Sequence, residues 1–277
     1  MSIVPGRRSR EERKPRLPSR ALPFRNRLLR WYRRHQRALP WRGVGDPYAV
    51  LVSEVMLQQT QVRRVREFYP RFLARYPTIE ELAAASLDAV CESWAGLGYY
   101  ARARHLHRAA RQVVRERAGV LPSESKELER LPGIGRYTAG AVASLAFGRD
   151  VPAVDTNVAR VLSRVFRVRG ERKSAPHTRR IWALAGALVP HGRAADWNQA
   201  LMDLGATICV ARAPRCRACP VAPVCGSRRE LPIEPALGPS PTCNTLLRSG
   251  GRLKRRAPRD RASRLGTFLW TRRPLGG

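Results

Sequence analysis

Four closely spaced cysteines, Cys209, Cys216, Cys219 and Cys225, are the residues of this chain best placed to do chemistry. Their spacing is C-x6-C-x2-C-x5-C, within a segment rich in Arg, Ala and Pro. Thiolates this close together can ligate a zinc ion or an iron–sulfur cluster. Zinc ribbons favour two C-x2-C arms, whereas this segment has one such arm and unequal outer gaps. The spacing therefore favours an iron–sulfur cluster, with zinc and a disulfide pair as the alternatives.

A glutamate at position 54 lies in the segment S-E-V-M-L-Q-Q-T, residues 53–60, where the apolar pattern is helical. Leu51 and Val50 precede it by one helical turn and share its face. A carboxyl group on an apolar face is desolvated, which raises its pKa as a general acid requires. The alternative is a structural glutamate paired with one of the many arginines.

A second carboxylate, Asp155, follows V-P-A-V at 151–154 and precedes T-N-V at 156–158. This position predicts a helix N-cap, because an Asp side chain accepts hydrogen bonds from the first N–H groups of a helix. A capping carboxylate can still face a cleft, so Asp155 is a candidate for chemistry. Capping alone is the alternative.

Residues 131–135 read L-P-G-I-G and lie between two helical patterns, 123–130 and 136–147. Two glycines let the backbone turn sharply and present free N–H groups at the start of a helix. Such a helix-hairpin-helix can hold a backbone phosphate without reading the base sequence. A tight turn that binds nothing is the alternative.

The charge balance points to a polyanionic partner. The chain has 53 Lys and Arg against 21 Asp and Glu, a net charge of +32 over 277 residues. The two ends hold many of these charges, but the middle remains basic, so nucleic acid is the expected partner. No apolar segment resembles a signal peptide or a membrane span. We therefore expect a cytoplasmic protein, associated with the nucleoid if it is bacterial. In the reducing cytosol, clustered thiols favour a bound metal over disulfides.

The periodicity predicts an all-α fold. Helical patterns extend from residue 21 almost to the cysteines, including helices over 46–59 and 99–118, others that open at Asp155 and Ser174, and one over 194–208. Residues 1–20 are expected to be a disordered basic arm, and 230–277 an irregular basic tail. Residues 21–229 are expected to be the folded domain.

Six motifs in chain order carry a family resemblance between about residues 22 and 226. They are LPWR at 39–42, SEVMLQQTQV at 53–62, WAGLGYYARAR at 94–104, LPGIGRYTAG at 131–140, VDTNVARVLSR at 154–164 and NQALMDLGATIC at 198–209. Together with the cysteines, they resemble the helix-hairpin-helix DNA glycosylases with a [4Fe–4S] loop, and most closely the MutY-type adenine glycosylases. The resemblance implies a six-helix barrel module at about 43–147 and a cluster module at about 21–42 plus 148–229, with the active-site cleft between them.

The resemblance also implies a reaction and its catalytic residues. Adenine mispaired with guanine or 8-oxoguanine flips out of double-stranded DNA, and Glu54 protonates it as general acid. Asp155 stabilises or transiently captures the oxocarbenium-like sugar before water completes the hydrolysis, and Tyr137 and Asn157 orient Asp155 and the water. The bifunctional endonuclease III type has a Schiff-base lysine where this chain has Tyr137, so we expect weak or absent strand cleavage. We expect a monomer.

Other positions inherit binding roles from the resemblance. The expected walls of the adenine pocket are Arg37, Trp41, Arg42 and Val62. The residues expected to enter the duplex and contact the opposite purine are Gln59, Thr60, Leu97 and Tyr99, with core packing as the alternative for the last two. The expected contacts with the DNA backbone are Gly133, Gly135 and Arg136, and the cluster ligands are the four cysteines.

The sequence departs from the family in two places. MutY-type proteins usually have glycine between the catalytic Asp and Asn, whereas this chain has Thr156. After the cysteines we find no pattern of the Nudix-like domain that recognises 8-oxoguanine, so we expect weaker discrimination of 8-oxoguanine from guanine. The rival hypotheses are a thymine or uracil mismatch glycosylase of the same fold and a non-catalytic DNA-binding iron–sulfur protein.

Overall fold

The computed structural model describes residues 17–171, 174–228 and 230. These residues form helices and loops with no strand among them, which confirms the all-α fold. None of their helices is long and apolar enough to cross a membrane. Contacts divide the chain into Met1–Pro235 and Ala236–Gly277, and the second unit lies wholly outside the described residues. Most of the expected arm (1–20) and nearly all of the expected tail (230–277) lie outside them too, so both stay predictions.

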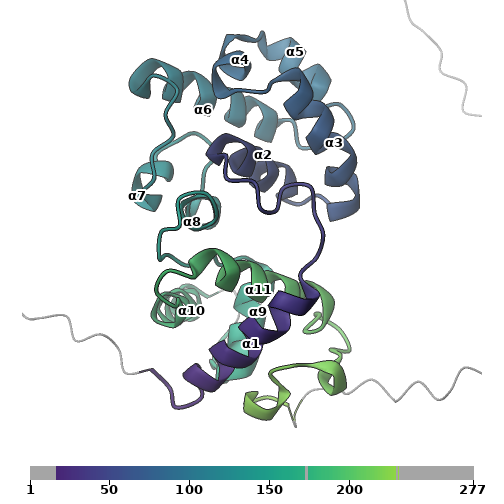
Figure 1. Cartoon of the computed structure of the whole chain (residues 1–277), viewed down its shortest axis with the longest axis vertical. Coiled ribbons are helices and arrows are strands. Elements are labelled where there is room, and N and C mark those ends of the chain that lie inside the picture. The colour runs from purple at the N-terminus through teal and green to yellow at the C-terminus, as the bar shows by residue number, and fades with distance from the viewer. Residues whose placement is uncertain (1–16, 172–173, 229, 231–277) are drawn as a thin grey trace, which may run out of the picture. The chain divides into compact units, whose positions relative to one another are not determined.

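Helices α2 to α8 form the first lobe. Helix α2 packs against α3, α6 and α8, as Figure 1 shows. It is apolar around its whole circumference, which is typical of a buried helix. Asp46 caps it by accepting from the backbone N–H groups of Tyr48 and Ala49 at 2.9 and 3.3 Å. The helices of this lobe are α2 (Pro47–Leu57), α3 (Val62–Arg75), α4 (Ile79–Ala84), α5 (Leu87–Ser93), α6 (Ala101–Arg117), α7 (Ser125–Leu128) and α8 (Arg136–Leu145).

Helices α1 (Ala21–His35), α9 (Thr156–Phe166), α10 (Ala175–Leu188) and α11 (Ala194–Thr207) form the second lobe around a separate apolar core. At its centre the indole of Trp197 is fully buried and packs edge-on against Phe24, with ring centroids 5.4 Å apart. The cysteine segment follows α11 and contains two short turns of 3-10 helix, Cys216–Ala218 and Ala222–Val224. The boundaries of the two expected modules stay predictions.

Buried polar contacts join the two lobes. The amide of Asn198 in α11 donates to Ser144 Oγ of α8 at 2.9 Å and to the Val151 carbonyl at 3.0 Å, and accepts from the Ala153 N–H at 3.1 Å. The backbone of α8 also approaches the 151–154 segment closely at Gly140. A Cβ added to Gly140 would lie 2.3 Å from the Pro152 carbonyl oxygen. These contacts fix the start of α9 relative to α8.

Candidate functional site

An open cleft of about 790 Å³ lies between the two lobes. Its walls bring together most of the residues singled out in the sequence: Arg37, Trp41, Arg42, Glu54, Gln59, Thr60, Val62, Tyr137, Asp155 and Asn157. Leu97, Tyr99 and the hairpin residues Gly133, Gly135 and Arg136 are not part of its lining. Leu97 is buried in the first core, whereas Tyr99 is 61% exposed. The cleft therefore unites the candidate catalytic residues with Gln59 and Thr60, and the other candidate duplex contacts are not part of its lining.

Glu54 is the buried acid of this cleft. It is only 4% exposed, and its carboxyl accepts a hydrogen bond from the Tyr137 hydroxyl at 2.7 Å. Burial raises the pKa of Glu54 to about 7, and the nearby Asp155 adds to the increase. The Tyr137 hydrogen bond and the Arg42 charge act in the opposite direction. A carboxyl group with such a pKa can donate a proton near neutral pH.

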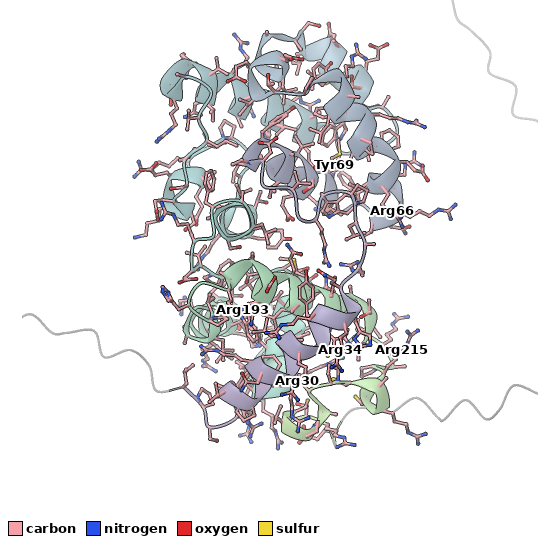
Figure 2. All side chains as sticks on the ribbon, in the orientation of Figure 1. Arg30, Arg34, Arg66, Tyr69, Arg193 and Arg215 are labelled. Carbon is pink, nitrogen blue, oxygen red and sulfur yellow. The ribbon has the colours of Figure 1, made fainter. Side chains whose placement is uncertain are left out.

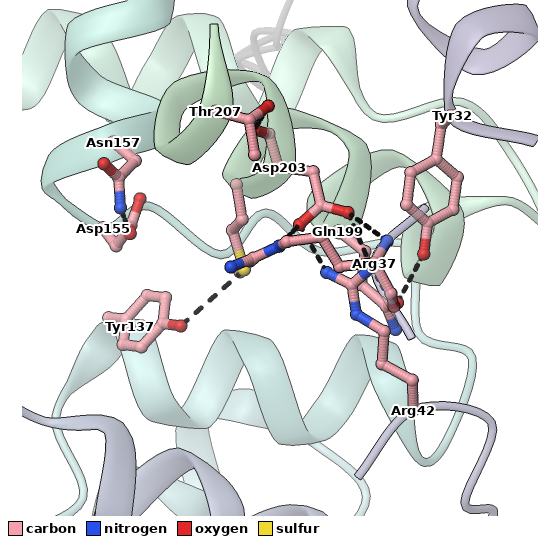
Figure 3. Close-up of polar contacts among 10 residues, drawn as sticks. Tyr32, Arg37, Arg42, Tyr137, Asp155, Asn157, Gln199, Asp203 and Thr207 are labelled. Atoms are coloured by element: carbon pink, nitrogen blue, oxygen red, sulfur yellow. Dashed lines mark hydrogen bonds and ion pairs between the residues drawn. The ribbon is translucent and has the colours of Figure 1, made fainter. Parts of the chain in front are cut away.

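Tyr137 enters the cleft from the first turn of α8, directly after the glycine hairpin. Burial first, and then the charges of Glu54 and Asp155, raise its pKa well above the ordinary value. The phenol therefore stays neutral and acts as a hydrogen-bond donor. Its hydroxyl also contacts the Met202 sulfur at 3.8 Å (Figure 3).

Asp155 caps α9, as the sequence predicts. One carboxylate oxygen accepts from the Val158 N–H and the other from the Asn157 amide, both at 2.7 Å. Both hydrogen bonds and the helix N-terminus stabilise negative charge. Arg160 in turn donates to the Asn157 side-chain oxygen at 2.7 Å and to the Cys209 carbonyl at 2.8 Å. A continuous chain of contacts thus leads from Asp155 to the first cysteine.

Helix α11, on the second-lobe side of the cleft, holds a buried group that the sequence analysis missed. Asp203 is fully buried in α11 and accepts from Arg37 at 2.5 Å and from Arg42 at 2.6 and 2.7 Å (Figure 3). Beside it, the Tyr32 hydroxyl donates to the Gln199 side-chain oxygen at 2.6 Å. Gln199 and Asp203 are one helical turn apart with the apolar Ala200, Leu201 and Met202 between them, and that spacing is the signal that could have revealed them.

The four cysteines line one small cavity next to the second core, together with Val165, Leu204 and Pro214. Arg164 is almost buried beside them, and it donates to the Cys209 sulfur at 3.4 Å and to the Val210 carbonyl at 2.7 Å. Four sulfurs with a neighbouring cation fit the chemistry of an anionic iron–sulfur cluster. Within the described ranges no three His, Cys, Asp or Glu side chains are arranged to hold a single metal ion. The lack of a single-ion site in the described ranges is compatible with a cluster, because cysteine sulfurs that bind a cluster lie farther apart than the ligands of one metal ion.

Arginines occur on both lobes in the view of Figure 2, including Arg30 and Arg34 on α1, Arg66 on α3, and Arg193 and Arg215 in the second lobe. Arg228 lines the cysteine cavity, and the cysteine segment itself carries the exposed Arg212, Arg215 and Arg217. A surface of this kind suits the phosphates of nucleic acid.

Comparisons with known proteins agree with this geometry. The family described as "HhH-GPD superfamily base excision DNA repair protein" matches residues 52–185. The chain is 47% identical to the adenine DNA glycosylase of Homo sapiens, over 77% of this chain and 41% of that protein. It is 46% identical to the adenine DNA glycosylase of Mycobacterium tuberculosis, over 70% of this chain and 64% of that protein. The chain thus spans about two fifths to two thirds of the length of these relatives.

Solved structures share the fold. A thermostable thymine-DNA glycosylase superimposes with a TM-score of 0.71 at 32% identity, over 76% of this chain and 97% of the other. An endonuclease III–DNA complex superimposes with a TM-score of 0.65 at 22% identity, over 78% of this chain and 98% of the other. The second likeness is one of fold alone.

The raised pKa of Glu54 predicts a pH-dependent stability. The folded chain holds this proton more tightly than the unfolded chain, where the pKa is about 4.3. The stabilisation is complete below that value and is lost as the pH rises through about 7. We expect the free energy of unfolding of the wild type to fall by up to about 3 kcal/mol over this range relative to Glu54→Gln.

Urea unfolding between about pH 5 and pH 8 measures this difference. Glu67→Gln, which changes an exposed glutamate of α3, is the control and should follow the wild type. Parallel pH curves for the wild type and Glu54→Gln would contradict a raised pKa.

Proposed function

Because the chain belongs to the HhH-GPD superfamily of base excision DNA repair proteins, we propose that it is a monofunctional adenine DNA glycosylase. It hydrolyses the N-glycosidic bond of adenine mispaired with guanine or 8-oxoguanine. The observation that carries the proposal is the cleft in which Glu54, Tyr137 and Asp155 meet. Several relatives, 37–47% identical to the chain, are adenine DNA glycosylases, which supports the choice of base.

The base must leave the duplex before Glu54 can reach it, because the acid lies inside the cleft. Glu54 is protonated near neutral pH and donates that proton to N7 of the flipped adenine. Protonation turns adenine into a neutral leaving group, so the bond between N9 and the sugar carbon C1′ breaks with its electron pair going to the base. The Tyr137 hydroxyl holds the carboxyl of Glu54 in place.

Asp155 acts on the sugar. Its carboxylate stabilises the positive charge that develops on the sugar when the base leaves, as the second carboxylate does in glycoside hydrolysis. Asn157 and the Val158 N–H fix both of its oxygens. Water then bonds to C1′, and its released proton passes to a carboxylate of the pair.

Other residues of the cleft lining supply recognition of the base. Trp41 and Val62 offer apolar surface, and Arg37 and Arg42 are held by Asp203. Tyr32 occupies the oxygen side of the Gln199 amide, so the Gln199 NH₂ group remains to donate to a ring nitrogen of the base. Gln199 thus extends the adenine pocket beyond the residues that the sequence predicts.

The contacts with the duplex are part of the proposal. The residues that enter the stack are Gln59, Thr60 and Tyr99, and those that hold the backbone are Gly133, Gly135 and Arg136, whereas Leu97 packs in the first core. Gly133 has a φ of +76°, and a Cβ there would lie 2.5 Å from the His105 side chain, so this turn requires glycine. Free N–H groups before α8 support phosphate binding.

A thymine or uracil mismatch glycosylase is the second candidate. The likeness to the thermostable thymine-DNA glycosylase favours it, because that structure is covered over 97% of its length at 32% identity. Thr156, which lines the cleft beside Asp155, also departs from the glycine of MutY-type proteins. The position of Glu54 beside Gln58, Gln59 and Thr60 favours adenine.

We propose that Cys209, Cys216, Cys219 and Cys225 hold a [4Fe–4S] cluster. The cluster would stiffen a basic segment that grips phosphates, and Arg164 would balance part of its charge. We expect purified protein to contain about four iron and four sulfide ions per chain, and Cys219→Ala to lose iron. Elemental analysis measures both, with Cys91→Ala as the control that keeps its iron. Stoichiometric zinc instead would favour the alternative.

Base release under single-turnover conditions tests the reaction. The duplexes hold A opposite 8-oxoguanine, A opposite G, and T or U opposite G. We expect free adenine from the first two and strand breaks only after alkali, because Tyr137 cannot form the imine that β-elimination needs. Asp155→Asn should lose this activity by a factor of at least about 10³, because it removes the charge that stabilises the transition state. Release of thymine or uracil instead would favour the second candidate.

A further inference from the structure

Two residues of the first lobe with exposed side chains have a left-handed backbone conformation. Gln59, just beyond α2, has a φ of +56°, and Tyr99, just before α6, has a φ of +50°. Such angles are uncommon for residues other than glycine and persist only where the surrounding structure imposes them. Something in this lobe must therefore hold both segments.

The guanidinium of Arg102 holds the first segment. Arg102 lies in the first turn of α6 and is only 8% exposed. Its Nη1 donates to the carbonyls of Val55, Met56 and Gln58 at 3.1, 2.7 and 2.5 Å. Val55 and Met56 belong to the last turn of α2 and Gln58 is its C-cap residue. Carbonyls at a helix end lack the N–H partners of a next turn, and the Gln58 N–H reaches only the Val55 carbonyl, at 3.4 Å. Arg102 therefore caps α2 from a different helix.

The same guanidinium holds the second segment. Its Nη2 donates to the carbonyls of Leu97 and Gly98 at 3.3 and 3.0 Å. It also lies 5.5 Å from the ring centres of both Trp94 and Tyr99. The Tyr99 ring, which faces solvent on its other side, thus rests on the buried cation.

The positions of these contacts connect them with the two left-handed residues. Gln58 directly precedes Gln59, and Gly98 directly precedes Tyr99, so Arg102 binds the carbonyl of each preceding peptide. One rigid, planar group therefore sets the distance between the two segments. Lysine could not replace it, because an ammonium is a point charge without the guanidinium fork.

We propose that Arg102 is a positioning residue that sets Gln59 and Tyr99 at the separation needed to open the duplex. The inference rests on the proposed function, in which these two side chains enter the base stack. Arg102 is not part of the cleft lining and does not contact Glu54 or Asp155. Its loss therefore impairs extrusion of the base and leaves the proton transfer in the cleft unchanged.

Arg102→Lys tests this inference, with Arg25→Lys as the matched control. Arg25 also caps a helix end, donating to the Leu188 and Ala187 carbonyls of α10 at 2.7 and 2.9 Å, but in the second lobe. The probes are fluorescence of 2-aminopurine at the target position, which rises on unstacking, and the single-turnover rate of adenine release against pH.

We expect Arg102→Lys to lose most of the fluorescence rise and to release adenine about 10- to 100-fold more slowly, with an unchanged pH midpoint. The rate should recover on a duplex whose target adenine faces an abasic site, because less unpairing is then required. Arg25→Lys should stay within about twofold of the wild type, since its contacts lie away from both segments.

An unchanged fluorescence rise in Arg102→Lys would overturn the inference. An equal loss of rate on both duplexes would also overturn it, because that result would indicate a general loss of folding. Thermal unfolding of Arg102→Lys and Arg102→Met measures such a loss of folding directly. Failure of the proposed function looks different, because the wild type itself would then release no adenine. The fluorescence of wild type and variant would still decide the role of Arg102 in opening DNA.

Discussion

Desolvation of the Glu54 carboxyl is the interaction on which the chemistry of this cleft depends. Helix α2 is apolar all round, so its one acidic side chain is buried with it and its pKa rises to about 7. Tyr137 must then be present as a donor, because a buried carboxyl without a partner would be costly. The two groups come from different helices, and α8 must therefore pack against α2 to bring them together.

The second requirement is that the two lobes keep a fixed position relative to each other. Asp155 belongs to α9 of the second lobe, whereas Glu54 and Tyr137 belong to the first. Asn198 ties α11 to α8 and to the segment before Asp155, and Asp203 ties α11 to the two arginines that precede α2. Removal of one partner of such a buried ion pair is strongly destabilising, since the other charge then stays buried alone. These contacts make the cleft geometry a property of the whole domain.

Local sequence patterns predicted the local features well. The Asp155 cap and the burial of Glu54 each follow from neighbours within one helical turn, and the structure confirms them. Long-range pairings were out of reach, because any of the many arginines could have paired with Asp203 or capped α2. Arg37, Arg42 and Arg102 differ from the others only in where the fold places them. The roles assigned to the site residues by resemblance stay predictions until they are measured.

The pH dependence of adenine release by the wild type and by Tyr137→Phe shows whether Glu54 donates the proton. The hydrogen bond from Tyr137 lowers the pKa of Glu54, so its removal should raise that pKa. We expect a single-turnover rate that falls above about pH 7 in the wild type, and a midpoint at higher pH in Tyr137→Phe. A rate that stays constant through this range, or the same midpoint in both proteins, would contradict Glu54 as the proton donor.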